Sequence, residues 1–174
     1  MTSTQTRSEH DTVRAAARGE RDALTTLFRE HWGGVHRLAS GLTGSQTAAD
    51  DIAQDAFERA FRSLARFDGR SSFRTWIHRI TVNRSVDEVR RTKPTVSIDD
   101  ALDLAAPEHA PADGALRAAV GNLAPDRRTV VVMRYWLDYT LPEIAAVLDV
   151  PEGTVHSRLS RALNDLRSAM EVPA

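Results

Sequence analysis

The chain has 174 residues and a mass of 19.2 kDa, a length that fits one ordinary domain or two small ones. With 41% hydrophobic and 27% charged residues, and no apolar run near the roughly 20 residues of a membrane-spanning helix, it is expected to be soluble and not to insert into membranes. Cysteine is absent, which excludes disulfides, thiolate nucleophiles and cysteine-based zinc sites. The formal net charge of -1 argues against a nucleic-acid partner, since such proteins are usually basic.

The charges are distributed unevenly along the chain. The positive residues are 22 Arg and one Lys. Residues 70–93 carry a net charge of +5 and residues 94–126 a net charge of -5, so the overall value is a cancellation. Adjacent blocks of opposite sign indicate two parts with different electrostatic roles, although a solvated Arg-rich helix before an acidic loop gives the same pattern.

Apolar residues recur at helical spacing through the first half of the chain. Residues 24–42 predict one helix. Gly44 is expected to end it, and Ser45 is expected to be the N-cap of the next helix. The clearest stripe runs from Ala49 to Leu64 and predicts a long amphipathic helix. A third helix is expected to begin after a capping Ser71 or Ser72 and to run to about Arg91.

Between Thr92 and about Gly114 the periodic pattern fails. This stretch contains three Pro and several acidic residues and has no apolar face of either period. The sequence therefore predicts an all-α fold in which two small helical domains, residues 1–91 and 115–174, are joined by a flexible acidic linker, residues 92–114. The first ten residues lack the apolar segment of a secretory signal, so a cytoplasmic location is expected.

The second domain contains the strongest local signal. A short helix with Ile144, Ala145 and Leu148 is followed by a tight turn at residues 149–151 and by another helix. This order predicts a helix-turn-helix, whose second helix enters a DNA major groove. A plain helical hairpin with a solvated face is the alternative. The candidate DNA-facing residues on the second helix are Thr154, His156, Ser157, Arg158, Ser160 and Arg161.

A second constellation occupies residues 70–91, where arginines alternate with aromatic residues. Arginines together with Asn83 suit phosphate binding and the capture of an unstacked base. Phe73 and Trp76 fit better as core aromatics on the buried stripe. The candidate DNA-binding residues are Arg70, Arg74, Arg79, Asn83 and Arg84.

Three segments together resemble one known family. Residues 49–61, 67–84 and 150–162, in this order and at this separation, are similar to the extracytoplasmic-function (ECF) sigma factors of the sigma-70 family, the small two-domain initiation subunits of bacterial RNA polymerase. The resemblance covers about residues 10 to 170. It implies binding to core RNA polymerase through its clamp coiled coil and flap regions, binding to promoter DNA, and control by an anti-sigma factor.

The resemblance also implies roles for individual residues. The first domain, similar to sigma region 2, would bind the clamp coiled coil and open the -10 element, with Asn83 at the place of a base reader. The second domain, similar to sigma region 4, would read the -35 element, with Arg158 toward phosphate and with His156, Ser157, Ser160 and Arg161 toward bases. His156 departs from the Lys or Arg that is frequent there. The implied polymerase-binding residues are Asp50, Asp51, Gln54, Asp55 and Arg59.

The acidic linker allows a more specific hypothesis. Its carboxylates, Asp99, Asp100 and Asp103 among them, would stand in for RNA phosphates in a basic channel of the polymerase until the transcript displaces them. A solvated tether without a specific path is the alternative.

Catalysis has little support in the sequence. There is no P-loop, no dinucleotide-binding glycine motif and no paired metal-ligand motif, so no enzyme activity, cofactor or metal is expected. The main alternative function is a helix-turn-helix transcriptional regulator that acts without polymerase, and a purely structural helical interaction protein is a third. The first domain favours the sigma factor, because a repressor would need a ligand pocket or a dimer face instead of an Arg-rich aromatic helix.

Overall fold

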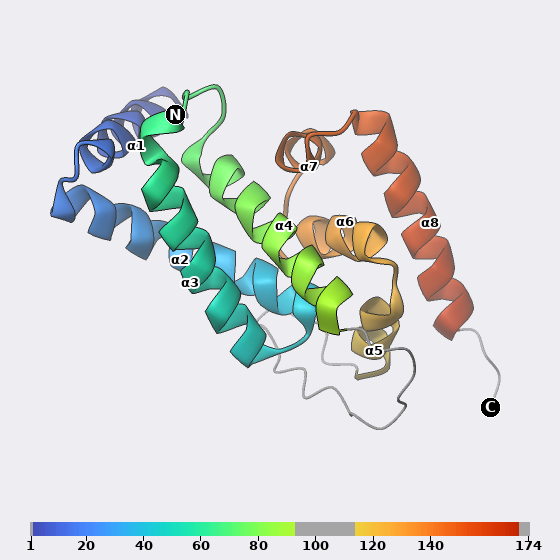
Figure 1. The fold of residues 1–174 in the computed structure, drawn as a ribbon. Coiled ribbons are helices and arrows are strands. Elements are labelled where there is room, and N and C mark those ends of the chain that lie inside the picture. The colour runs from blue at the N-terminus through green and yellow to red at the C-terminus, as the bar shows by residue number, and fades with distance from the viewer. Residues whose placement is uncertain (1, 93–113, 171–174) are drawn as a thin grey trace.

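The computed structural model describes residues 2–92 and 114–170, and all regular structure within these ranges is helical (Figure 1). This confirms the predicted all-α class. The predicted linker lies outside the described residues except at its two ends. The elements are α1 (Thr2–Ala17), α2 (Arg21–Thr43), α3 (Gln46–Ser63), a 3-10 turn (Leu64–Arg66), α4 (Phe73–Thr92), α5 (Gly114–Asn122), α6 (Pro125–Tyr135), α7 (Leu141–Leu148) and α8 (Glu152–Met170).

Helices α1 to α4 form the first unit. The turn between α2 and α3 is the predicted one: Gly44 adopts the left-handed conformation at φ 73° and donates its N–H to the Ser40 carbonyl, and the Ser45 hydroxyl accepts from the Ala48 N–H at 3.3 Å. The apolar stripes of α2, α3 and α4 meet in one core. Its fully or nearly fully buried members include Leu27, Val35, Ala53, Phe57, Phe73 and Ile77.

The glycine pair in the middle of α2 does not interrupt the helix. Gly33 and Gly34 have low helix propensity, but α2 continues through them because its apolar face packs against α3 and α4 on both sides of the pair. Gly34 has a packing role as well. A Cβ at this position would lie 3.2 Å from Nε2 of His78, so the missing side chain lets α4 approach α2 closely.

Helices α5 to α8 form the second unit, in which α7 and α8 make the predicted helix-turn-helix. Thr140 and Glu143 form a capping box at the start of α7. Asp149 ends α7 in the left-handed conformation at φ 55°. The buried residues that hold α6, α7 and α8 together include Val130, Met133, Ile144, Val147, Val155 and Ala162.

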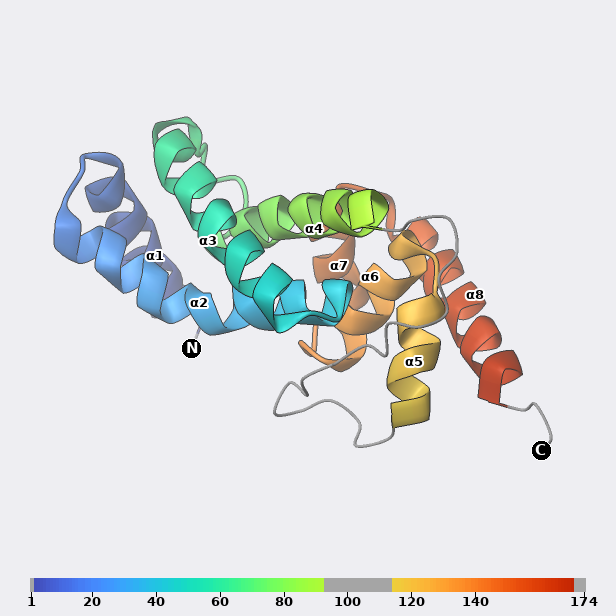
Figure 2. The same cartoon turned by 60° about the horizontal axis from the view of Figure 1, so that its bottom comes forward.

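The two units pack directly against each other (Figure 2), with α4 lying along α6 and α7. Leu38 and Leu42 of α2 and Val82 of α4 belong to the same apolar cluster as the core of the second unit. The described residues therefore form one continuous body, although the sequence divides into two helical units.

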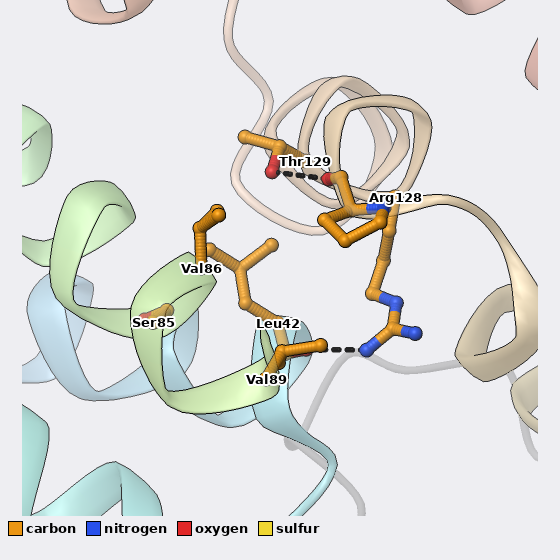
Figure 3. Close-up of a pocket in the computed structure, with 7 residues that line it drawn as sticks. Leu42, Ser85, Val86, Val89, Arg128 and Thr129 are labelled. Atoms are coloured by element: carbon orange, nitrogen blue, oxygen red, sulfur yellow. Dashed lines mark hydrogen bonds between the residues drawn. The ribbon is translucent and has the colours of Figure 1, made fainter. Parts of the chain in front are cut away.

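A buried guanidinium crosses the boundary between the units. Arg128 of α6 is 6% exposed, and its Nη1 donates to the Leu42 carbonyl of α2 at 2.7 Å (Figure 3). Its Nη2 donates to the carbonyls of Gly121 and Leu123. Beside it lies a cavity of about 10 Å³, lined by residues such as Ser85 and Val86 of α4, which holds one water molecule at most.

The capping box yields a stability prediction. Thr140→Ala removes the side-chain acceptor of the Glu143 N–H and should lower the free energy of unfolding by about 1 kcal/mol in urea titrations. Thr140→Ser keeps an acceptor oxygen at the same place and should retain most of the wild-type value. Equal stability of the wild type and the Ala variant would show that this cap does not contribute.

Candidate nucleic-acid interface

The candidate DNA-binding helix α4 begins at a serine cap. The Ser72 hydroxyl accepts from the Thr75 N–H at 3.1 Å. Phe73 is 1% exposed and Trp76 packs on the same core, so these aromatics are core residues, as the sequence indicates. Asn83 is exposed on the outer face of α4, where a base could reach it.

The arginines around the start of α4 have different surroundings. Arg70 lies before the helix with 89% of its side chain exposed, at 3.3 Å from an Asp68 oxygen. Arg74 places its guanidinium carbon 4.2 Å from the centroid of the Tyr139 ring. Of these two, Arg74 already has a partner in the second unit, whereas Arg70 is open to solvent.

Arg79 is engaged by the helix-turn-helix. Its Nη2 donates to the Ala146 carbonyl at 2.6 Å and its Nε to the Val147 carbonyl at 3.1 Å. Both carbonyls belong to the last turn of α7, where backbone oxygens lack intrahelical partners and carry partial negative charge. Nη2 also lies 4.0 Å from a carboxylate oxygen of Asp149. The guanidinium therefore lies at the C-terminal end of α7, where the partial negative charge of the backbone carbonyls stabilises a cation.

A carboxylate joins α3 to α4. Asp55 accepts from Nε of Arg59 at 2.9 Å, and the Arg84 guanidinium pairs with the same carboxylate. Partial burial raises the pKa of Asp55, but the hydrogen bonds from Arg59 and Arg84 outweigh it and hold the pKa below its usual value. Three predicted site residues from two separate sets therefore meet in one ion cluster.

The other predicted polymerase-binding residues lie on the exposed face of α3. Asp51 and Gln54 are exposed, and the Gln54 amide is 3.4 Å from the Glu58 carboxylate. Asp50 is also exposed and lies 3.0 Å from Nε2 of His36 on α2. These three residues form an accessible acidic and polar surface, whereas Asp55 faces α4.

Helix α8 presents the polar face that the sequence predicts. Val155 and Ala162 are buried against α6 and α7, which leaves the other side of the helix to solvent. His156, Ser157, Ser160 and Arg161 are exposed, and Thr154 is half-buried. This arrangement suits a recognition helix in a major groove.

Arg158 differs from its neighbours on α8. It is half-buried at the edge of a groove of about 180 Å³ between α4, α6 and the α7–α8 turn, and its Nε lies 3.5 Å from an Asp126 oxygen. Its predicted contact to phosphate stays a prediction.

The roles predicted for the linker residues Asp99, Asp100 and Asp103 fall outside the described residues.

Three functional-looking residues at the boundary of the units were not singled out from the sequence. His78 is 1% exposed, its Nδ1 lies 2.5 Å from the hydroxyl oxygen of Tyr139, and Tyr139 is 2% exposed. Arg128 is the third. No periodic or motif signal marks them: isolated polar helix residues such as His78 and Arg128 are normally expected to face solvent, and Tyr139 lies between α6 and α7, where no helical period applies.

Burial controls the protonation of His78 and Tyr139. It lowers the pKa of His78 to about 3, with further contributions from the charges of Arg74, His31 and Arg37, and it raises the pKa of Tyr139 to about 12. The neutral imidazole therefore accepts, and the phenol donates, the hydrogen bond between them. His31 lies in the first unit, where burial and the charge of Arg74 lower its pKa to about 4.

Two further observations concern the described part of the chain. None of its helices is long and apolar enough to cross a bilayer. Among the same residues, no group of three or more His, Asp or Glu side chains is placed to hold a metal ion.

The buried histidines yield a pH prediction. His78 is neutral in the folded protein and binds a proton below pH 6.5 once unfolded, so the free energy of unfolding should fall as the pH drops from 6.5 toward 3. At pH 5 this one group should remove about 2 kcal/mol relative to pH 8. His31 acts in the same direction.

Urea titrations of the wild type and of His78→Gln at pH 8 and at pH 5 measure this contribution. The variant should show a smaller difference between the two pH values, whatever its absolute stability. An equal difference in both proteins would contradict the assignment of a buried neutral imidazole.

Comparison with known proteins gives matches over both units. Residues 27–95 match the family described as Sigma-70 region 2, and residues 113–166 match Sigma-70, region 4. The ECF RNA polymerase sigma factor SigM of Mycobacterium tuberculosis is 35% identical over 159 residues, which cover 90% of this chain and 81% of that protein. The ECF RNA polymerase sigma factor SigW of Bacillus subtilis is 28% identical, and the match covers 91% of this chain and 94% of that protein.

A solved structure resembles the whole arrangement. CnrH, determined in complex with the cytosolic domain of CnrY, has a TM-score of 0.75 and 25% sequence identity, with 95% of this chain and 99% of that chain covered. The similarity therefore extends over both helical units.

Proposed function

The chain belongs to the ECF sigma factors of the sigma-70 family, which associate with RNA polymerase and direct it to promoters, and we propose how its residues divide this work. The matches to regions 2 and 4 in the expected order favour this function over that of a regulator acting without polymerase. Region 2 includes α3 and α4 and region 4 includes most of α8, and the exposed faces of these three helices are assigned different roles below.

The exposed face of α3 is the proposed contact to core polymerase. Asp51 and Gln54 support this assignment because both are exposed, and the contact of the Gln54 amide is to Glu58 of the same helix. Asp50 shares this face beside His36. Asp55 and Arg59 have a different task in this proposal: they hold Arg84 of α4 in place relative to α3.

The outer face of α4 is the proposed -10 contact. Exposed Asn83 reads a base, and the surrounding arginines bind phosphates of the opened strand. The exposed face of α8 reads the -35 element, with Ser157, Ser160 and Arg161 nearest the bases. The observation that carries the proposal is that a helix-turn-helix with a polar recognition face follows a matched region 2 in the same chain.

The proposal extends to partners and location. The protein acts in the cytoplasm on polymerase and promoter DNA, with no reaction of its own and no cofactor. An anti-sigma factor is proposed as its regulator. In support, the CnrH structure, whose match covers 95% of this chain, was determined with a second protein bound, the cytosolic domain of CnrY.

Promoter-dependent transcription tests the assignment. Core polymerase supplemented with this protein should produce transcripts from a library of genomic promoter fragments, whereas core polymerase alone should not. Binding of the protein to duplex DNA without any association with core polymerase would support a polymerase-independent regulator instead.

Single substitutions test the division of work. Arg161→Ala should weaken transcription from a -35-dependent promoter by roughly tenfold, because one base or phosphate contact is lost. Arg167→Ala, on the same helix, where the guanidinium donates to the Asn164 side-chain oxygen, is the matched control and should retain wild-type activity. Equal activities of both variants would contradict the role of Arg161.

A second pair of variants tests the polymerase contact. Asp51→Ala combined with Gln54→Ala should raise the dissociation constant for core polymerase at least tenfold, because two exposed polar groups of the proposed contact are removed. Arg62→Ala, also exposed on α3 but outside the predicted set, is the control. Affinity measurements by fluorescence anisotropy separate this effect from DNA binding, and unchanged affinity of the double variant would contradict the assignment.

A further inference from the structure

Helix α1 has no part in the proposed function, yet it packs tightly on the first unit. The match to region 2 begins at residue 27, so α1 precedes it. Val13 and Ala16 are each 4% exposed and belong to the apolar core of the first unit. Helix α1 also contacts the 3-10 turn that follows α3 (Figure 1). It is therefore fixed next to the start of the α3–α4 loop, residues 67–72.

The α3–α4 loop holds Arg70 in a defined direction. One carboxylate oxygen of Asp68 accepts from the Arg70 N–H at 3.0 Å, and the other lies 3.3 Å from Nε of the same arginine. Gly69, between them, adopts the left-handed conformation at φ 70°, which residues with a Cβ rarely take. The direction of the Arg70 side chain thus depends on the backbone at Asp68 and Gly69.

The imidazole of His10 on α1 lies against this loop. A Cβ on Gly69 would be 3.2 Å from Cε1 and 3.5 Å from Nδ1 of His10, so the ring contacts the loop where any other residue would carry its side chain. The preceding residue ties α1 to α2, because Oε1 of Glu9 lies 3.9 Å from Nε2 of His31. The ring of His10 is therefore held between the body of the first unit and the loop.

A ring in this place limits the freedom of the glycine. Glycine populates positive and negative φ about equally, so Gly69 without a neighbour has access to several conformations. Fixing one residue in a single backbone conformation changes an equilibrium by roughly tenfold. A loop that is already fixed loses less of this freedom when a ligand binds, and it therefore binds more tightly.

We propose that His10 is a positioning residue for the -10 contact: its ring fixes the turn at Gly69 and so holds Arg70 in the direction in which it meets the DNA strand. The proposal rests on the DNA-binding role assigned to the arginines around α4. It extends the functional part of the first unit to α1, upstream of the matched region. His10 acts through the loop and makes no contact of its own to DNA.

Holoenzyme assembled from core polymerase and the full chain tests this role. The probe is a fluorescently labelled single strand that carries the -10 element of a promoter the holoenzyme transcribes. His10→Ala should raise the dissociation constant for this strand by roughly threefold to tenfold. His10→Phe keeps a ring over Gly69 and should restore most of the affinity. Equal losses in the two variants would overturn the proposal.

A double-mutant cycle shows whether His10 acts through Arg70. Arg70→Ala should weaken binding of the strand, and His10→Ala added to it should cause no further loss. Additive losses would mean that His10 contacts DNA directly, which overturns its positioning role. Arg14→Ala removes an exposed charge from the same helix and is the matched control. A loss as large as that of His10→Ala would show that α1 itself binds DNA, which also overturns the proposal.

Backbone amide relaxation, measured by NMR on the full chain, reports the loop directly. The order parameters of the Gly69 and Arg70 amides should fall from about 0.85 in the wild type toward about 0.6 in His10→Ala, and His10→Phe should restore them. Order parameters that do not change in His10→Ala would contradict a role of the ring in fixing the loop.

The variants distinguish failure of the inference from failure of the proposed function. If Arg70→Ala weakens strand binding but His10→Ala does not, the positioning role is overturned and the proposed function stands. If Arg70→Ala has no effect while promoter-dependent transcription is intact, the assignment of Arg70 to DNA fails together with the inference.

Discussion

The arrangement of the molecule depends on the close packing of α6 against the C-terminal half of α2. Gly41 leaves room for the Trp136 ring, and beside it Arg128 extends across the boundary to the Leu42 carbonyl. The apolar cluster of the second unit continues into α2 and α4 through Leu38 and Val82. Because this packing sets how α4 lies against α7, it also decides which side chains of the proposed DNA surface remain free.

The chemistry of this boundary is mixed. Apolar contacts alone would favour a permanent association, since their exposure to water is costly. Here a guanidinium, an imidazole and a phenol are buried along with the apolar side chains, and each exchanges its protein partner for water when the units separate. Boundaries of this composition resemble transient interfaces between domains more than the core of a single domain.

A chain with a net charge of -1 can carry the proposed nucleic-acid surface because its positive residues are concentrated in one block. The positive block lies on and around α4, where backbone carbonyls, an aromatic ring and the Asp55 carboxylate engage several of its arginines. In the proposed function, DNA phosphates would take the place of these partners. Asp55 in addition ties α4 to α3, so the helix proposed to bind polymerase and the helix proposed to bind DNA are held in a set relative orientation.

Local features of the sequence determined the helices and the folding class. The helix end at Gly44, the cap at Ser45 and the stripe from Ala49 to Leu64 all depend on residues close together in sequence, and each lies in the structure where the pattern predicts it. The exposed face of α8 follows from the same periodicity. The sequence alone also indicated the family, because the resemblance rests on three motifs in a set order and does not depend on packing.

Only the tertiary structure decided which residues of the two units contact each other. Arg79 and Asn83 are four residues apart on one helix, but only Arg79 meets the end of α7. Likewise, no sequence pattern predicts that His78 finds Tyr139, 61 residues away, or that Gly41 is needed to admit Trp136. Periodicity tells which face of a helix is buried, whereas the partner on that face depends on long-range packing between segments that carry no mutual signal in the sequence.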